Sequence, residues 1–551
     1  MNENKEKLKI GILLDTFIVP SWVYQIFELL TKSPFLTIDL IILNNETKNQ
    51  TISKTTLAGK NEYLLYRFFR KFDSRFASSS PHVDTNSENL LEGIPILNVT
   101  PIRTKFSDKI NERDIDEIQS HDLDVILRFG FRILRGDILT SSKFGIWSFH
   151  HGDDDANRGG PPGFWEVMQD QPITGCLLQI LSEDLDGGKI IRKSFSATHP
   201  FSVILNNFHM YWKSPPILLQ SLKLLYDNKN NFYSEISKYN NELNFYDNKL
   251  YTIPKNNEML KLLPKYFLKL FKYKLNSKMY FDQWFLMFSI GDSIQKSFWR
   301  YKKIIPPKDR FWADPHIFYK DEKYFVFIEE YFFKNSKGVI SVFEINKNGE
   351  YTKPIKILEE DYHLSYPFVF QFENDLYMIP ETKDQKNIQL YKCTKFPYEW
   401  KFEHNLIDNI SAVDATLLEY DKKWWLFVNT PSYESSTFNE ELKIFYSENP
   451  ITGTWKPHNK NPFIFDIRKA RSAGKIFEYD GSLYRPSQNS SNNYGFGLVF
   501  NKISKLNEFE YDEKTVMSLE PKWEKNIQGF HTFNYLNGLS IIDARKRISQ
   551  F

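Results

Sequence analysis

Residues 144–190 read FGIWSFHHGDDDANRGGPPGFWEVMQDQPITGCLLQILSEDLDGGKI. The apolar run from Phe144 to Trp147 predicts a buried strand that leads into the pair His150-His151. Residues 152–163 are too rich in Gly, Pro and Asp for a helix or a strand, so we expect a loop there. Loops of this kind, carried on rigid strands, are where catalytic side chains usually lie. The surroundings of His150 are therefore the first place to look for a catalytic site.

The second part of the stretch returns to regular structure. It predicts a helix over 164–168, a strand over 175–181 and a tight turn over 185–188, which carries Asp186. A His at a strand end, met by an Asp from a later loop, forms a general acid/base pair. His150 and Asp186 are therefore candidate catalytic residues.

The same residues resemble the formyltransferases that use 10-formyltetrahydrofolate. The matching elements, in chain order, are His150, Arg158-Gly159, Trp165, Thr174-Gly175 and Leu185-Asp186-Gly187-Gly188. Five matches in order are far more specific than any one of them. The chain departs from the family at Ser148, where the family has Asn, and its His-Pro-Ser loop reads His150-His151-Gly152.

The resemblance implies an α/β Rossmann-like domain that forms an amide. In that reaction an amine attacks the formyl carbon, an oxyanion develops, and a proton is removed. His150 and Asp186 take the family's acid/base and oxyanion roles, and Ser148 donates one hydrogen bond from a shorter side chain than Asn. Loss of a well-placed oxyanion donor typically lowers the rate on the order of a hundred- to a thousand-fold. The site is then active with Ser148, slow, reshaped with His151 as a substitute, or repurposed.

The resemblance also implies where the folate and the acceptor bind. In the family, the strand and loop over 124–134 line the pterin pocket largely through backbone groups. The candidate cofactor-binding residues are Arg128, Phe129, Gly130, Phe131, Arg158 and Gly159, and Trp165 is a candidate substrate-binding residue. No metal is predicted, because the run Asp153-Asp154-Asp155 is more typical of a solvated loop.

Composition limits the broad class of the protein. At 551 residues the chain is well past the roughly 250–300 at which one core stops growing, so we expect two domains or more. The net charge of +2 gives no argument for nucleic acid as a partner. Two cysteines form neither a disulfide framework nor a metal set. Without a signal-peptide pattern or an apolar run of about 20 residues, the sequence predicts a cytoplasmic protein.

The N-terminal part predicts a doubly wound sheet. Apolar strands are expected over 9–15 and 36–43, with a helix over 21–32 between them. A helix is also expected over 61–77, with a basic and aromatic face made by Tyr66, Arg67, Phe69 and Arg70. That face either contacts a phosphate or a partner, or is a solvated helix face.

We expect the first domain to occupy 1–230 and a helical linker to occupy 231–285. Residues 256–275 place apolar side chains on one helical stripe and lysines on the rest of the helix. Such a helix either lies on an anionic membrane surface or docks between domains.

An internal repeat begins at Phe311 and continues to the C-terminus. Five units, each a strand, a short turn and a second strand, recur about every 50 residues, as in a β-propeller. The second strands end in Glu329, Glu381, Asn429, Gln488 and Asp543. The sequence thus predicts an all-β five-bladed β-propeller over 286–551.

The starts of these units resemble arabinanase-type propellers and the N-terminal region of plant glucosamine inositolphosphorylceramide transferases. Asp314 and Asp414 match two of the glycosidase carboxylates, but Arg471 to Gly474 occupy the place of the third. An inverting glycosidase needs both an acid and a base, which argues against hydrolysis. Asp314, Asp414, Arg471 and His531 would still suit carbohydrate binding; a purely structural or oligomerising role is the alternative.

Together the two resemblances predict transfer of formyl from 10-formyltetrahydrofolate to an amino sugar of a surface-glycan precursor, with the propeller holding the acceptor. Formylation of initiator tRNA is disfavoured, because the chain lacks that relative's small barrel and a strongly basic face. Two alternatives stay open. One is a carbohydrate-binding protein whose transferase site has decayed at Ser148, and the other is a glycan-modifying or glycosyl-transferring enzyme centred on the propeller.

Overall fold

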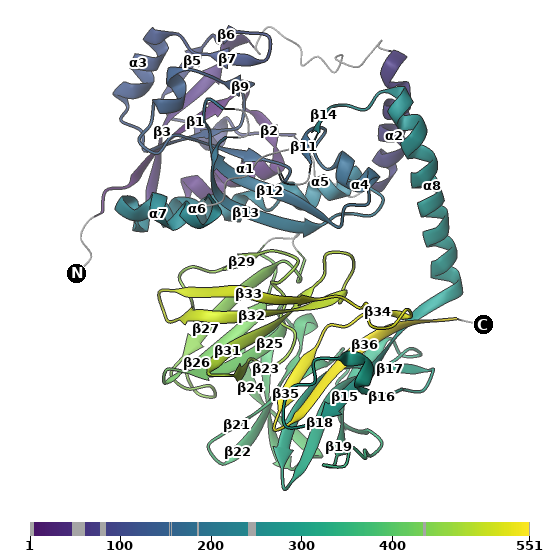
Figure 1. The fold of residues 1–551 in the computed structure, drawn as a ribbon. Helices are drawn as coiled ribbons and strands as arrows, with labels where there is room; N and C mark the ends of the chain where they lie inside the picture. The colour runs from purple at the N-terminus through teal and green to yellow at the C-terminus, as the bar shows by residue number, and fades with distance from the viewer. Residues whose placement is uncertain are drawn as a thin grey trace. The chain divides into compact units, whose positions relative to one another are not determined.

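The computed structural model describes residues 5–46, 61–77, 84–153, 155, 157–184, 187–240, 249–432 and 437–549. The chain divides into two compact units, Met1–Leu268 and Lys269–Phe551, drawn in Figure 1 from purple to yellow along the chain. This division differs from the expected linker over 231–285. Helix α8 (Asn256–Met279) contributes its first half to the first unit and its second half to the second unit, which continues with the strand that starts at Tyr280.

The first unit is built on a seven-stranded sheet in the order β13-β12-β10-β8-β1-β3-β5. Its strands are β1 (Leu8–Leu14), β3 (Leu36–Asn44), β5 (Ile96–Val99), β8 (Val125–Arg128), β10 (Ile146–His150), β12 (Ile173–Ile180) and β13 (Lys189–Ala197). The strands from β10 to β5 run parallel, whereas β12 and β13 are antiparallel to their neighbours. The expected Rossmann-like α/β domain is confirmed.

Further helices of the first unit precede α8, and they include elements on both faces of this sheet. They are α1 (Ser21–Thr31), α2 (Leu64–Asp73), α3 (Glu112–Ser120), α4 (Phe164–Met168), α5 (Val203–Tyr211), α6 (Ser214–Asp227) and α7 (Phe232–Ile236). Small pairings complete the unit: β2 (Ile18–Pro20) with β4 (Asp84–Asn86), β6 (Ile102–Arg103) and β9 (Ile133–Leu134) with β7 (Ser107–Lys109), and β11 (Arg158–Gly159) with β14 (Leu250–Tyr251).

The pleat of β10 decides which side chains can act together. Successive side chains of a strand point to opposite faces. Trp147 stacks on Phe232 of α7, with ring centroids 5.5 Å apart, and so lies on the α7 face. Ile146 packs in a core cluster with Ile115 and Ile118 of α3, on the opposite face. Ser148 and His150 share the face of Ile146.

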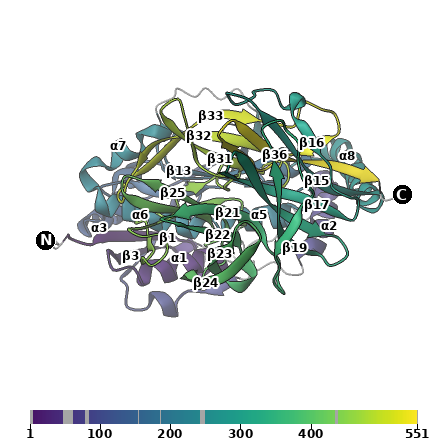
Figure 2. The same cartoon turned by 90° about the horizontal axis from the view of Figure 1, so that it is seen from below.

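The second unit consists of five antiparallel sheets among the residues that the structure describes. The first sheet contains β17 (Arg310–Lys320), β18 (Lys323–Phe332), β19 (Lys337–Ile345) and β20 (Ile355–Leu358), and the second contains β21 (Ser365–Phe372), β22 (Asp375–Glu381), β23 (Asn387–Lys395) and β24 (Glu399–Asp408). The third sheet contains β25 (Val413–Tyr420), β26 (Lys423–Asn429), β27 (Glu441–Ser447), β28 (Lys456–Pro457) and β29 (Ile464–Phe465). The fourth sheet contains β30 (Phe477–Tyr479), β31 (Ser482–Asn489), β32 (Gly497–Leu506) and β33 (Tyr511–Leu519). In Figure 2 the inner strands β21, β25 and β31 lie near the middle of this unit, and outer strands such as β24 and β33 lie toward its rim.

The fifth sheet joins the two ends of the unit. It contains β15 (Tyr280–Ile290), β16 (Lys302–Ile304), β34 (Ile527–Gly529), β35 (Phe533–Leu536) and β36 (Leu539–Ser549). β15 pairs with β36 along its whole length, from Tyr280 opposite Ser549 to Ile290 opposite Leu539. This ladder closes the ring, and the predicted five-bladed β-propeller is confirmed. No helix in the described ranges is long and apolar enough to span a membrane.

Three of the inner strands start with the same irregularity. Their register shifts between Ala313 and His316, between Ser365 and Phe368, and between Val413 and Thr416. At each shift one residue is left-handed: Asp314 with φ 51°, Tyr366 with φ 43° and Asp414 with φ 52°. A bulge of this kind re-aims a side chain out of the ladder. The repeated bulge therefore directs side chains from different blades toward common contacts.

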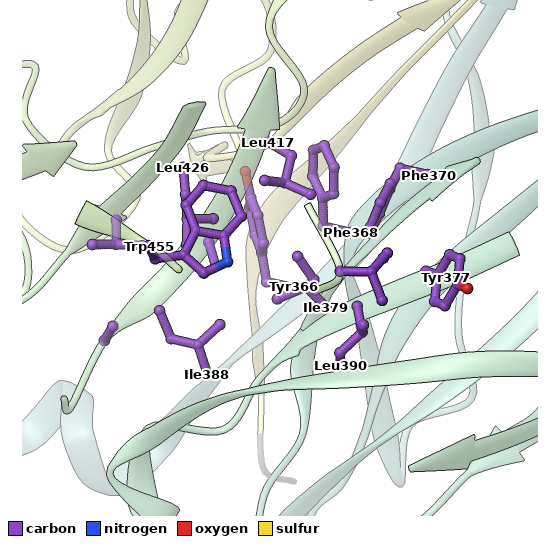
Figure 3. Close-up of a cluster of buried hydrophobic side chains, with 14 residues drawn as sticks. Tyr366, Phe368, Phe370, Tyr377, Ile379, Ile388, Leu390, Leu417, Leu426 and Trp455 are labelled. Carbon is purple, nitrogen blue, oxygen red and sulfur yellow. The ribbon is translucent and has the colours of Figure 1, made fainter. Parts of the chain in front are cut away.

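Tyr366 connects three consecutive blades. Figure 3 shows it beside Phe368, Leu417 and Trp455 in a buried apolar cluster. Its hydroxyl lies 2.8 Å from Thr416 Oγ1 of the next blade and accepts the backbone N–H of Gly474, which precedes the fourth blade's β30, at 2.9 Å. This fully buried hydroxyl adds a polar link between blades that also meet through apolar packing and through contacts such as the Arg471–Asp414 ion pair.

We predict that Tyr366→Phe lowers the free energy of unfolding by about 1–3 kcal/mol, because the buried Gly474 N–H loses its acceptor. Urea denaturation of the full chain measures the change. Tyr420→Phe, at an exposed tyrosine, is the matched control and should leave the midpoint unchanged. Equal midpoints for the two variants would contradict the prediction.

Candidate functional site

His150 and Ser148 lie at the carboxyl end of β10, next to the two strands that flank it. His150 pairs with Leu177 of β12, and Ser148 pairs with Gln179 of β12 and Arg128 of β8. Residues in register on neighbouring strands direct their side chains to the same face. The structure therefore places Ser148, His150 and Arg128 on one face of the sheet.

The guanidinium of Arg128 is fixed by three hydrogen bonds. Nη1 donates to Ser148 Oγ at 3.1 Å, and Nη2 donates to the carbonyls of Phe131 at 2.9 Å and Arg132 at 3.0 Å. Burial lowers the pKa of Arg128, whereas the charges of Asp15 and Asp108 raise it. The Nε–H is buried, and no acceptor for it lies among the described residues. Arg128 thus presents an unsatisfied N–H beside Ser148.

The other predicted cofactor residues of β8 and its loop are engaged in the fold. The Phe129 N–H donates to the Leu13 carbonyl at 3.0 Å, and the Phe131 N–H donates to Asp15 Oδ1 at 3.0 Å. The Phe131 ring is buried in the core. Gly130 passes so close to β1 that a Cβ there would lie 2.4 Å from the Asp15 nitrogen. Of the run from Arg128 to Phe131, only Arg128 directs its side chain to Ser148.

Arg158, Gly159 and Trp165 hold the loop that follows His150. Arg158 and Gly159 pair with β14, and a Cβ on Gly159 would lie 2.2 Å from the Tyr251 carbonyl oxygen. The buried Trp165 donates its indole N–H to the Gly160 carbonyl at 3.2 Å and packs on the Tyr251 ring. These contacts fix the position of the loop in the described structure.

Glu166 is a site residue that the sequence analysis missed. It lies on α4 with only 4% of its surface exposed. Burial, and then the charge of Asp153, raise the pKa of its carboxyl to about 7, and His150 opposes the rise. Asp153 packs against β12, where a Cβ on Gly175 would lie 2.7 Å from the Asp153 Cβ. A signal was available, because Glu166 is the one charged residue in the apolar segment Phe164–Met168.

His151 does not substitute for the absent Asn, contrary to one expectation. Its ring lies on the opposite face of β10, 4.4 Å from the Tyr211 ring and 5.4 Å from the Trp22 ring. Burial, and then the charge of His150, lower the pKa of His151 to about 3. This imidazole therefore stays neutral in an aromatic environment. Asp186, the predicted partner of His150, lies outside the described residues.

The second unit brings together all four of the side chains predicted to bind carbohydrate. Arg471 Nε lies 2.6 Å from Asp414 Oδ2, and His531 Nε2 lies 3.6 Å from Asp314 Oδ1. The charge of Asp414 raises the pKa of Asp314, so the two pairs adjoin. Residues that are 100 positions apart in the sequence meet because each occupies the same place in its own blade.

Burial dominates the electrostatics of this cluster. It raises the pKa of Asp314 to about 6 and also raises the pKa of Asp414. The pKa of Glu329 is raised well above its usual value by burial and by Asp314 and Glu381. Burial lowers the pKa of His531, but the charges of Asp543 and Asp314 outweigh it and the net shift is upward.

Asp543 forms hydrogen bonds with backbone N–H groups of this cluster. Its carboxylate accepts the N–H groups of Asp314 at 3.0 Å, His531 at 2.9 Å and Thr532 at 3.0 Å. Asp314, His531 and Asp543 offer ligand atoms within 4.8 Å of one another, as a metal site would. Both carboxylates already accept hydrogen bonds from within the cluster, so they hold its backbone and side chains in place.

Aromatic rings surround the cluster. The Trp284 ring stacks on His531 with centroids 4.0 Å apart, and the Arg471 guanidinium lies 4.8 Å from the centre of the Tyr494 ring. Aromatic faces beside carboxylates and a guanidinium are typical of surfaces that bind polar ring compounds.

Residues 304–538 match the family described as glucosamine inositolphosphorylceramide transferase 1, N-terminal. The rice protein of that name (Oryza sativa subsp. japonica) is 40% identical over 209 residues, which are 37% of this chain. The match spans only 28% of the rice protein. Methionyl-tRNA formyltransferase of Synechococcus sp. (strain CC9311) is 32% identical over 92 residues, which are 17% of this chain and 26% of that protein.

Solved structures of both kinds are also similar to parts of the chain. Glycinamide ribonucleotide transformylase 1 from Symbiobacterium toebii covers 41% of this chain and 92% of its own, at 14% identity and a TM-score of 0.29. CoXyl43, a GH43 beta-xylosidase/alpha-arabinofuranosidase from a compost metagenome, covers 44% and 91%, at 14% identity and a TM-score of 0.33. The sequence comparisons confirm both resemblances, one to a formyltransferase and one to glucosamine inositolphosphorylceramide transferases.

We predict that Glu166→Gln changes how stability depends on pH. The folded-state pKa of about 7 lies above the usual 4.5, so the unfolded chain binds fewer protons between these values and stability falls as pH rises. Gln cannot ionise, so the variant should gain on the order of 3 kcal/mol relative to the natural protein between pH 4.5 and pH 8. Urea unfolding at the two pH values measures this.

The matched control is Glu117→Gln, at an exposed position of α3. Its free energy of unfolding should change between the two pH values by the same amount as that of the natural protein. If the free energy of unfolding of Glu166→Gln also changes with pH as that of the natural protein does, the Glu166 carboxyl is not held in a costly ionised state.

Proposed function

We propose that the chain transfers a formyl group from 10-formyltetrahydrofolate to the amino group of an amino sugar in a surface-glycan precursor. The observation that carries this proposal is the convergence of His150, the Arg128–Ser148 pair and Glu166 around the end of β10. The formyltransferase motifs, met in order along the chain, lead to that same place.

The side chains at this place fit a bound formyl donor. The buried Arg128 Nε–H has no acceptor among the described residues, and a carbonyl oxygen of a bound folate would supply one. His150, Ser148 and Arg128 would hold the donor's reactive end. When bound, 10-formyltetrahydrofolate supplies the formyl group that the amine takes up.

The residues of the chain divide the remaining work. Arg128 replaces the missing Asn as a hydrogen-bond donor toward an oxygen that gains negative charge, and Ser148 Oγ orients its guanidinium. His150 supplies a second donor from the same face. Glu166, whose pKa of about 7 leaves it partly ionised near neutral pH, accepts the proton that the amine releases, directly or through His150.

The propeller supports the choice of an amino sugar. Its inner cluster holds Asp314, Asp414 and Asp543 together with Glu329 and Glu381, against the cations Arg471, His531 and Lys383. Carboxylates in this excess accept hydrogen bonds from sugar hydroxyls and attract an ammonium group. A glycan that carries both could be held by the propeller and formylated at the first unit.

Binding of a stable formyltetrahydrofolate analogue, measured by calorimetry, tests the proposed function. We expect micromolar binding by the natural protein and at least tenfold weaker binding by Arg128→Lys, which cannot bond Ser148 and two carbonyls at once. His150→Ala should lose formyl transfer and keep the analogue. Absence of heat for the natural protein would overturn the proposal, and unchanged binding by Arg128→Lys would remove Arg128 from the site.

A second candidate function is modification of a glycan at the propeller itself. The observation that favours it is the pair of carboxyls Asp314 and Glu329, both with a raised pKa, beside the ion-paired Asp414. Neighbouring carboxyl groups whose surroundings give them different pKa values are typical of acid/base sites.

Carboxamide variants separate the two candidates. If the propeller only binds the acceptor, Asp414→Asn should weaken binding of glucosamine oligomers at least tenfold and leave the folate analogue bound as before. Asp421→Asn, in an exposed turn, is the control. Folate-independent turnover of the oligomers that Asp414→Asn abolishes would instead establish the second candidate.

A further inference from the structure

A cavity of about 600 Å³ lies between α2 and the loop that follows His150. Its lining includes Arg67, Arg70 and Lys71 of α2, Pro161 of the loop, Phe164 of α4 and Asn207 of α5. A neighbouring cavity of about 490 Å³ shares Tyr66, Arg70 and Pro161 with it. We call the two together the α2 pocket. All of its lining residues belong to the first unit.

The α2 pocket is positively charged. Arg67, Arg70 and Lys71 are exposed, and none of them forms an ion pair within the described ranges. Among the described lining residues, the one carboxylate is Asp73. That carboxylate accepts the Ile204 N–H at 3.0 Å, at the start of α5. Burial raises the pKa of Asp73 and the charge of Arg70 opposes the rise, so this carboxylate offsets part of the positive charge, and the three cations leave the lining with a net positive charge.

Aromatic rings and a buried amide form the inner wall. Tyr66 and Phe69 meet the Phe164 ring edge-on, at centroid distances of 5.3 Å and 5.8 Å. The side-chain oxygen of Asn207 is buried, and no donor for it lies among the described residues. The wall can thus pack on a ring and accept a hydrogen bond, while the rim supplies positive charge.

The pocket shares structural elements with the candidate formyl-transfer site. Phe164 lines the pocket, and Glu166, two residues further along α4, lies near His150 and Asp153. Asn206, adjacent to the lining residue Asn207, donates to Thr174 Oγ1 of β12 at 3.0 Å. A molecule that fills the pocket therefore lies next to Pro161 and Pro162 and next to α4, the helix that carries Glu166.

We propose that the α2 pocket binds the phosphate or diphosphate group of an activated amino sugar. This amino sugar is the acceptor of the proposed function, and the inference rests on that function. Guanidinium groups bind phosphate oxygens in pairs, so Arg67 and Arg70 suit a diphosphate. The cavity has the size of a small-molecule site, and its aromatic wall suits the ring that a diphosphate carries. The charged group anchors the acceptor, and the amino group reaches the end of β10.

Calorimetry with three probes tests the proposal: inorganic pyrophosphate, uridine diphosphate and farnesyl diphosphate. All three carry the diphosphate, and the preferred one distinguishes a soluble nucleotide carrier from a lipid carrier. We expect the double variant Arg67→Gln/Arg70→Gln to bind the preferred probe at least tenfold more weakly, and the affinity of the natural protein to fall as salt is raised. Arg75→Gln, on an exposed arginine outside the lining, is the matched control and should bind normally.

The inference is overturned if the natural protein binds none of the probes, or if the double variant and the control bind them equally. It is also overturned if only anionic phospholipid vesicles bind in an arginine-dependent way, because α2 would then be a membrane contact. The folate analogue is titrated into the same samples. Folate binding without diphosphate binding rejects the pocket alone, whereas diphosphate binding without folate binding rejects the proposed function alone.

Discussion

The close passage of the loop over 151–163 against β12 and β14 is the constraint on which the first unit's site depends. At Gly175 a Cβ would meet Asp153, and at Gly159 a Cβ would meet the Tyr251 carbonyl. With no side chain at either place, the loop lies directly on the strands and carries α4 into a fixed position. One side of α4 then directs Glu166 toward His150, and the other lines the α2 pocket. The same two contacts therefore set the positions of both candidate sites.

Ser148 is better understood as the hydrogen-bond partner of Arg128 than as the loss of the family's Asn. A smaller side chain leaves room for the Arg128 guanidinium, which Ser148 and the carbonyls of Phe131 and Arg132 hold in place. A buried cation is costly unless it is compensated, and Asp15 and Asp108 supply the compensation. The arrangement exchanges a neutral amide donor for a charged one, and charged donors form the stronger hydrogen bonds.

The sequence was sufficient for features that repeat or that depend on local pattern. The apolar runs and Gly-rich breaks located the strands around residues 144–190, and regular spacing located five blades and the four side chains that meet in the propeller. Glu166 and the Arg128–Ser148 pair were not found, because strand register and the packing of α4 bring them together. The two compact units divide at Leu268, within α8, and the sequence pattern of α8 continues across that position without a break.

The buried charges in the inner cluster of the propeller carry a cost in folding free energy. Apolar side chains of similar volume usually stabilise a buried position as well as an ion pair or better, and an unpaired buried charge costs far more. Yet Asp314, Glu329, Glu381 and Asp414 are all buried near one another, and the cations Arg471, His531 and Lys383 compensate only part of their charge. Protonation relieves the repulsion, as the raised pKa values of Asp314 and Glu329 indicate. Hydroxyl donors and a positive charge from a bound molecule would relieve it too, and an amino sugar offers both.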